Sequence, residues 1–185
     1  RTFREGDADT PVVVFTYLNP VFRYGVDRFL EDAEAAGADG LLLTDLPLGE
    51  DPALESKLEA SPLALVRLVA PTTPPDRARR IAERAQGFLY YISRTGVTGA
   101  RSELRTELEG EVRTLEEAAS VPVVVGFGIS SPEQAARVGR LAEGVVVGSA
   151  LIERIRQGGP GRGGAAAAET FIAGLRAALD GIVAE

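Results

Sequence analysis

The sequence contains no cysteine, histidine, methionine or tryptophan. Without cysteine, the chain can form neither a disulfide nor a thiolate metal site. Without histidine, it lacks the commonest general base and the commonest transition-metal ligand of proteins. We therefore expect no metal site, and any acid–base chemistry falls to Asp, Glu, Tyr or the single lysine, Lys57.

Basic side chains are scarce relative to acidic ones. The 185 residues carry a formal net charge of -7, which argues against a nucleic-acid-binding protein because such a protein needs a basic face. No apolar run reaches the roughly 18 to 20 residues of a membrane span, and the start does not resemble a signal peptide. With 45% hydrophobic residues, we expect one soluble cytoplasmic domain with a sizeable core, spanning residues 1–185.

Short apolar runs alternate along the chain with stretches of helical spacing. The β-branched run at residues 11–17 is typical of a strand buried on both faces. Further strands are expected at residues 41–44, 64–70, 88–92, 121–126 and 144–147, and helices at 24–36, 51–60, 76–85, 104–119, from 132, 149–155 and 169–183. Six strand–helix units in strict alternation predict a parallel sheet.

Both an open doubly wound sheet and a (β/α)8 barrel satisfy this alternation. No G-x-G-x-x-G stands at a strand–helix junction, which weakens the case for a dinucleotide-binding fold. Two turns of small residues, Gly126-Phe127-Gly128 and Gly148-Ser149-Ala150, follow the last two strands. Many barrels bind phosphate at these two junctions, so the barrel is the favoured architecture.

The length of the chain bears on how much of a barrel it contains. A full barrel needs about 250 residues, so six units predict that two more belong before Arg1. The chain opens on arginine rather than methionine, and residues 1–9 look like the end of a charged helix and its exit loop. We therefore expect a piece of a longer protein, whose partial sheet has two open edges.

The most informative stretch is the loop after the strand at residues 88–92. Gly96 and Gly99 permit close approach of the backbone to a ligand, and Thr95 and Thr98 supply hydroxyls. This loop belongs to a series of five motifs: Thr16-Tyr17-Leu18-Asn19-Pro20, Leu43-Thr44-Asp45-Leu46-Pro47, Ser93-Arg94-Thr95-Gly96-Val97-Thr98-Gly99, Gly126-Phe127-Gly128-Ile129-Ser130 and Gly148-Ser149-Ala150-Leu151. Together the motifs resemble the tryptophan synthase α chain family, over nearly the whole sequence from about residue 11.

The resemblance implies a (β/α)8 TIM barrel, of which this chain holds the last six strand–helix units, numbers 3 to 8. The activity it implies is the retro-aldol cleavage of indole-3-glycerol phosphate to indole and glyceraldehyde 3-phosphate, a lyase step of tryptophan biosynthesis. Members of the family work bound to a β chain, in an α2β2 assembly. Pyridoxal phosphate belongs to that β chain, so no cofactor is expected in this one.

The resemblance also implies roles for matched positions. The residues expected to hold the substrate phosphate are Gly99, Gly128, Gly148 and Ser149. The residues expected to line the indole and glycerol pocket are Phe15, Leu68, Tyr90 and Phe127. Tyr90, Thr98 and Asp45 are expected to support the chemistry, Thr98 from a mobile loop that closes over substrate. Asn19 and Pro20 are expected on the β-chain side.

The sequence departs from the family in one respect. The family's acid–base glutamate, and the aspartate that holds the indole N–H, lie on units that would precede Arg1, and nothing here matches them. No catalytic residue is therefore assigned, and the fragment alone is expected to be inactive, because the reaction needs a carboxylate to move protons. A non-catalytic, phosphate-ligand-binding regulatory partner and another phosphate-binding biosynthetic TIM barrel are the alternatives.

Several of these residues also have simpler interpretations. Asp45 could serve only to stabilise its loop, and Gly148-Ser149 could be an ordinary strand–helix turn. Only one of Tyr90 and Tyr91 can face a barrel interior, because side chains alternate along a strand. The arginines of residues 77–84 predict a solvated helix face, and the Gly/Ala-rich residues 158–168 predict a flexible connector before the last helix.

Overall fold

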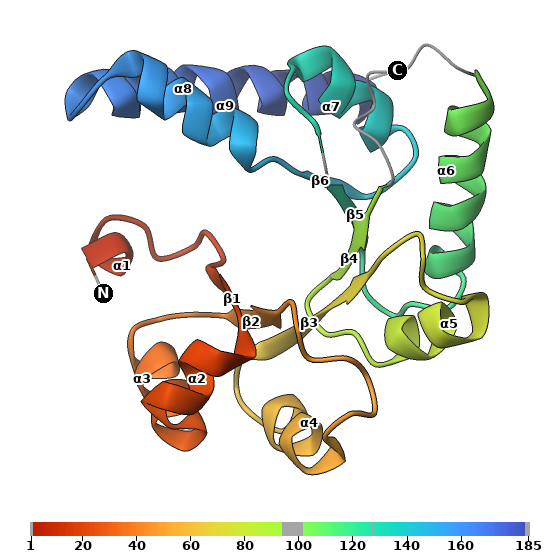
Figure 1. The fold of residues 1–185 in the computed structure, drawn as a ribbon. Coiled ribbons are helices and arrows are strands. Elements are labelled where there is room, and N and C mark those ends of the chain that lie inside the picture. Colours follow the sequence, from red (N-terminus) through yellow and green to blue (C-terminus); the bar gives the residue numbers. More distant parts are fainter. Residues whose placement is uncertain (1, 94–101, 127, 184–185) are drawn as a thin grey trace.

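The computed structural model describes residues 2–93, 102–126 and 128–183. Within this part of the chain, six parallel strands form one sheet in the order β1-β2-β3-β4-β5-β6 (Figure 1). The strands are β1 Val13–Thr16, β2 Gly40–Leu43, β3 Ala64–Val69, β4 Leu89–Ile92, β5 Val123–Gly126 and β6 Gly144–Val146. The curved sheet is a half-barrel, which confirms the predicted partial TIM barrel.

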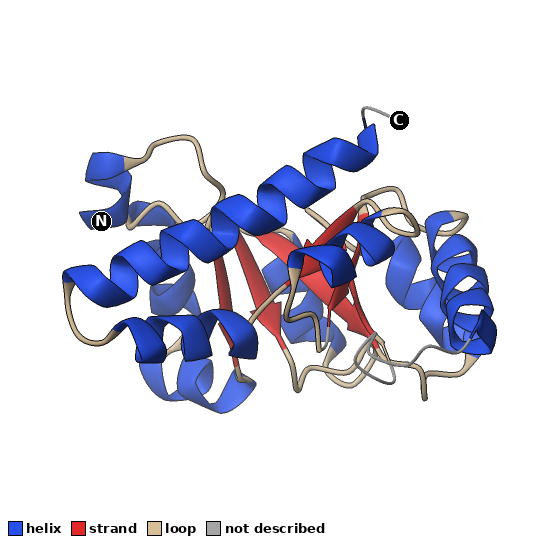
Figure 2. Ribbon diagram, turned by 90° about the horizontal axis from the view of Figure 1, so that it is seen from above, coloured by secondary structure: helices blue, strands red, loops and turns tan. Residues whose placement is uncertain are grey.

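Helices cover the outer face of the sheet (Figure 2). They are α1 Thr2–Gly6, α2 Leu18–Tyr24, α3 Val26–Ala35, α4 Pro52–Glu59, α5 Pro75–Glu83, α6 Ser102–Glu116, α7 Pro132–Gly139, α8 Ser149–Gly158 and α9 Arg162–Val183. Most of the core lies between these helices and the outward residues of the strands, such as Leu41, Leu65 and Val125. In the described part of the chain, no helix is both long and apolar enough to cross a membrane.

The register of the strands determines which side chains face the barrel axis. Leu42 pairs with Val66, and Leu68 pairs with Tyr90 on the next strand. Leu42, Val66 and Tyr90 form a small cluster of their own, separate from the core beneath the helices. Because side chains alternate along each strand, this cluster is the inner face of the half-barrel.

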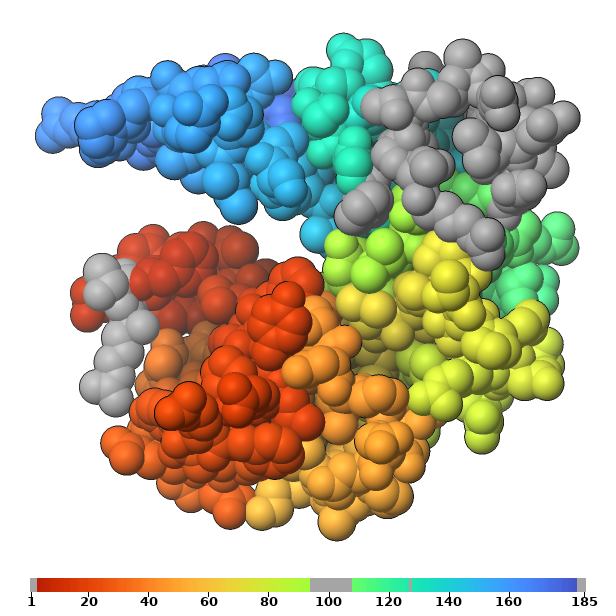
Figure 3. All heavy atoms as spheres, in the orientation of Figure 1, coloured from red at the N-terminus to blue at the C-terminus, as the bar shows by residue number. Residues whose placement is uncertain are grey.

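Both outer strands of the sheet have a free edge, as predicted from the count of units. Within the described residues, β1 pairs only with β2, and β6 only with β5. Large apolar side chains are exposed near these edges, including Phe15 (61% exposed) and Tyr17 on the β1 side and Ile152 on α8. The molecule is hollowed between the α8–α9 pair and the β1–α2 region (Figure 3).

The structure corrects two predicted boundaries. Leu18-Asn19-Pro20, for which no helix was predicted, begins α2, and Gly25, at a φ of +95°, separates this helix from α3. Proline has no backbone N–H, and it is tolerated in the first turn of a helix because an N–H at that place would have no intrahelical acceptor. Likewise the connector predicted at residues 158–168 is confined to residues 159–161, since α9 begins at Arg162. Residues 165–168 are all alanine, the residue type with the highest helix propensity, which favours helix in this stretch.

Candidate functional site

Two aromatic side chains meet on the otherwise largely aliphatic inner face of the half-barrel. The ring of Phe15, on β1, meets the ring of Tyr90, on β4, edge to face, with centroids 6.4 Å apart and planes at 90°. Leu68 packs against the cluster that contains Tyr90. Three of the residues predicted to line an indole pocket therefore lie on one concave surface, which suits a flat apolar ligand.

Of the two adjacent tyrosines, Tyr90 faces the barrel axis. It is 9% exposed, and burial raises the pKa of its phenol, so the side chain is neutral at ordinary pH. Tyr91 faces the other way and donates a hydrogen bond of 2.5 Å from its hydroxyl to Glu111 Oε2 on α6. The alternation of the strand thus leaves Tyr90 for the site and gives Tyr91 a structural role.

Asp45 follows β2 at the carboxyl end of the sheet. Its Oδ1 accepts a 2.7 Å hydrogen bond from the N–H of Leu18, the first residue of α2. The carboxylate is therefore at the N-terminus of a helix, where negative charge is favourable. Asp45 joins the segments after β1 and β2 at the rim of the inner face, and its observed contact is that of a loop-stabilising carboxylate.

The turns after β5 and β6 adjoin each other, because Gly126 pairs with Val146 at the ends of these strands. Gly128 has a φ of +72°, which favours glycine. Gly148 is the N-cap of α8 and Ser149 its first residue; both are exposed, and among the described residues no side chain caps this helix start. A Cβ added at Gly148 would meet no atom within 4 Å. Open backbone N–H groups at a helix N-terminus can bind an anion.

Three predicted site residues, Thr98, Gly99 and Phe127, lie outside the described residues. The described part of the chain contains no group of acidic side chains that could hold a metal ion. Sequence reasoning had given Ser93 no separate role. This buried serine donates from its N–H to the Gly126 carbonyl at 3.0 Å, so it joins the ends of β4 and β5 where the Ser93–Gly99 motif begins.

One known protein family matches almost the whole of this chain. The family described as "Tryptophan synthase alpha chain" matches residues 1–178. The chain belongs to the tryptophan synthase alpha chain family. The family resemblance inferred from the five motifs is therefore confirmed.

Individual members of the family agree with this assignment. The tryptophan synthase alpha chain of Shouchella clausii is 52% identical over 145 residues, which are 78% of this chain and 54% of that relative. The match thus spans about half the length of the curated relative. The alpha subunit of Legionella pneumophila has a TM-score of 0.83 at 36% identity, covering 98% of this chain and 67% of that one. Tryptophan synthase of Mycobacterium tuberculosis gives 0.77 at 38% identity, with 93% and 63% covered.

Proposed function

We propose that this protein acts as the α subunit of tryptophan synthase and cleaves indole-3-glycerol phosphate to indole and glyceraldehyde 3-phosphate. The observation that carries the proposal is the arrangement of two neighbouring features at the carboxyl end of one sheet. One is the aromatic inner face formed by Phe15 and Tyr90. The other is the pair of open glycine turns after β5 and β6, beside the uncapped N-terminus of α8. The first suits an indole ring and the second a phosphate group.

The residues described here bind and orient substrate in this proposal. Backbone N–H groups at Gly128, Gly148 and Ser149 hold the phosphate, aided by the partial positive charge of the start of α8. Phe15 and Tyr90 hold the indole ring by apolar and edge-to-face contact. This positioning fixes the carbon–carbon bond that breaks between indole C3 and the glycerol chain.

Cleavage moves two protons, and we assign neither proton transfer to any of the described residues. Indole C3 gains a proton as the bond breaks, and the adjoining glycerol hydroxyl loses one as it becomes the aldehyde. We assign these transfers to a carboxylate on strand–helix units that precede β1 in the complete protein. The 185 residues alone should therefore not catalyse the reaction.

The proposal includes a partner and a location. We propose that the protein works with a tryptophan synthase β chain in an α2β2 assembly in the cytoplasm. Pyridoxal phosphate belongs to that β chain, which receives the indole released here. Asn19 and Pro20, in the first turn of α2, are proposed to lie toward the partner; both are exposed at the rim near the free edge of β1.

The deciding experiment begins with the intact mass and N-terminal sequence of the natural protein. A mass about 8 to 9 kDa above 19.5 kDa fits two further strand–helix units. The purified protein is then mixed with indole-3-glycerol phosphate, and indole is measured by absorbance. Indole release supports the lyase. A natural chain that begins near Arg1, or one that binds the phosphate ester without cleaving it, would instead favour the non-catalytic regulatory partner.

A further inference from the structure

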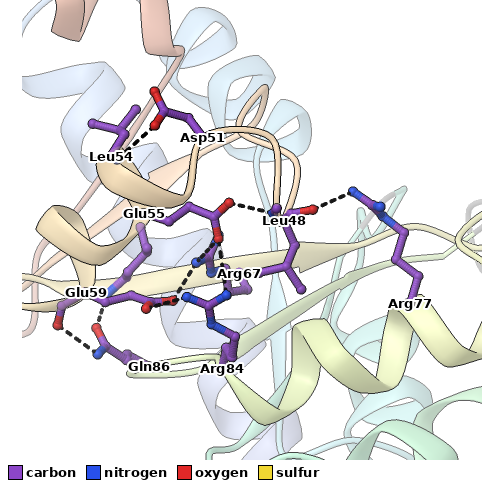
Figure 4. Close-up of polar contacts among 11 residues, drawn as sticks. Leu48, Asp51, Leu54, Glu55, Glu59, Arg67, Arg77, Arg84 and Gln86 are labelled. Atoms are coloured by element: carbon purple, nitrogen blue, oxygen red, sulfur yellow. Dashed lines mark hydrogen bonds and ion pairs between the residues drawn. The ribbon is translucent and has the colours of Figure 1, made fainter.

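A buried charged cluster lies on the outer face of β3, on the opposite side of the sheet from the aromatic site (Figure 4). It consists of Glu55 and Glu59 on α4, Arg67 on β3, and Arg84 at the end of α5. Arg67 Nη2 lies 3.1 Å from Glu55 Oε2 and 2.6 Å from Glu59 Oε1. Glu55 is 0% exposed and Arg67 is 5% exposed, so each needs a partner of opposite charge; Arg67 also pairs with Glu59, and Arg84 lies 3.6 Å from Glu55.

Glu55 also holds the loop between β2 and α4. Its second oxygen, Oε1, accepts a 2.5 Å hydrogen bond from the N–H of Gly49. The preceding residue in this loop is held from α5, because Arg77 donates to the carbonyl of Leu48 at 3.0 Å. Two helices thus fix the loop through hydrogen bonds to its backbone, as Figure 4 shows.

Hydrogen bonds matter for this loop because close packing does not fully support it. A cavity of about 190 Å³ lies against the loop, and its lining includes Leu46, Pro47, Leu48, Arg67 and Arg77. A segment beside a cavity lacks the dense van der Waals contact that holds most core elements in place. The bonds from Glu55 and Arg77 therefore add to the packing of Leu46 and Leu48 against the core in fixing the position of the loop.

The same loop begins at Asp45, which is bonded to the first residue of α2. The N–H of Leu18 belongs to the first turn of that helix and so has no intrahelical acceptor. Its acceptor is Asp45 Oδ1, at 2.7 Å. Side-chain bonds therefore connect Arg67 to Glu55 and Glu55 to Gly49; the chain itself runs from Gly49 back to Asp45, whose bond to Leu18 reaches the rim of the site.

We propose that Glu55 is a positioning residue for the substrate site: through Gly49 it fixes the loop that carries Asp45, and Asp45 in turn fixes the start of α2. Glu55 touches no substrate and acts only through this loop. The part of the inference that concerns substrate rests on the function proposed above. The coupling between Gly49 and Leu18 does not.

The test is amide hydrogen exchange, resolved by residue with NMR, on the protein with its complete natural sequence. In Glu55→Leu, the amides of Gly49 and Leu18 should both exchange at least about tenfold faster, as expected for losing a hydrogen bond to a charged acceptor. In Glu55→Gln, whose amide oxygen can still accept from Gly49, both should stay protected. Glu50→Gln removes an exposed carboxylate from the same loop and is the matched control, with no change expected.

A kinetic measurement separates positioning from a general loss of stability. Looser substrate positioning in Glu55→Leu should raise KM for indole-3-glycerol phosphate several-fold with a smaller change in kcat, because ground-state and transition-state binding are weakened together. If the unmodified protein releases no indole, the proposed function fails, and the exchange data still decide the coupling. Leu18 exchange that does not follow Glu55 would overturn the inference.

A second measurement covers the case in which Glu55→Leu does not fold. Exchange in the unmodified protein is followed at increasing, sub-denaturing urea concentrations. The amides of Gly49 and Leu18 should open in one step, with the same dependence on urea, because one loop movement exposes both. Independent opening of the two amides would contradict the proposal.

Discussion

Gly126 leaves space that the ring of Tyr90 fills. A Cβ added at Gly126 would overlap the Tyr90 hydroxyl and lie 2.5 Å from one of its ring carbons. Gly126 ends β5, and Tyr90 is on the neighbouring strand β4, so the close approach joins the two strands on the inner face. Gly126, the last residue of β5, therefore makes room for the Tyr90 ring as well as leading into the turn that follows the strand.

This contact predicts the effect of Gly126→Ala. The added methyl group must displace the Tyr90 ring, and forcing extra volume into a packed site costs about 1 to 3 kcal/mol of unfolding free energy. Displacement also exposes the phenol, so the raised pKa of Tyr90 should fall toward its ordinary value. Urea unfolding and ultraviolet titration of the tyrosines measure the two effects.

The matching control removes the ring. In a Tyr90→Ala background, Gly126→Ala should cost almost nothing, so that the two substitutions are strongly non-additive. Equal costs in both backgrounds would show that the alanine acts through the backbone of the turn and not through Tyr90.

The charged cluster on the outer face predicts a pH dependence centred on Glu59. Burial alone would raise the pKa of Glu59, but hydrogen bonds and ion pairs from Arg84 and Arg67 outweigh it and hold the pKa below its ordinary value of 4.5. A carboxyl group with a lowered folded-state pKa stabilises the fold above its unfolded pKa, and this stability is lost as pH falls through the folded pKa.

Glu59→Gln should therefore cost about 1.5 to 3 kcal/mol at pH 7, the range for hydrogen bonds to charged groups. The difference from the unmodified protein should shrink as the pH falls below 4.5. Urea unfolding at a series of pH values measures it. Glu83→Gln, which removes an exposed carboxylate on α5, is the control and should change stability little at any pH. If the loss of stability in Glu59→Gln stays constant with pH, the ionised carboxylate of Glu59 is not the source of the stabilisation.

The connection between α8 and α9 shows where sequence reasoning fell short. The Gly/Ala composition of residues 158–168 is that of a flexible linker, yet most of it is helix. The small residues serve close helix packing: a Cβ at Gly158 would lie 2.5 Å from the Gly163 carbonyl oxygen and 2.8 Å from Ala167 Cβ. Composition alone does not distinguish residues that are small for flexibility from residues that are small for contact.

Gly163→Ala tests this explanation. Its added Cβ would overlap the carbonyl oxygen of Gly158, a backbone atom that no rotamer change can move. We expect a loss of about 1 to 3 kcal/mol in unfolding free energy, although alanine favours helix more than glycine does. Gly174→Ala, in the same helix, would meet only Pro132 Cγ at 3.6 Å and should stabilise by about 0.5 to 1 kcal/mol. Stabilisation by both substitutions would restore the linker interpretation.

Many of the features that the sequence predicted correctly are local ones. The β-branched and apolar runs specify the strands, and the alternation along β4 leaves one tyrosine of the adjacent pair for the inner face. The charged cluster was not predictable, because Glu55 and Arg67 come from separate elements and only the packing of α4 on β3 makes them neighbours. The arginines of residues 77–84 were predicted to be solvated, and Arg79, Arg80 and Arg84 are indeed exposed. What the sequence did not show is that Arg77 donates to the Leu48 carbonyl and that Arg84 pairs with Glu59.

The proposed phosphate site gives the last prediction, which concerns Gly148→Asp. A Cβ added at this position meets no atom within 4 Å, and the φ of −117° is accessible to any residue, so the fold should survive. The new carboxylate would lie at the start of α8 and repel a phosphate; two like charges about 4 Å apart near a protein surface repel by about 4 kcal/mol. Calorimetric binding of glycerol 3-phosphate to the complete natural chain should therefore be abolished in Gly148→Asp. Gly148→Asn has the same shape without the charge and should weaken binding far less. Equal affinities of the Asp and Asn variants would remove the phosphate from this turn, and with it the main physical support for a phosphorylated substrate.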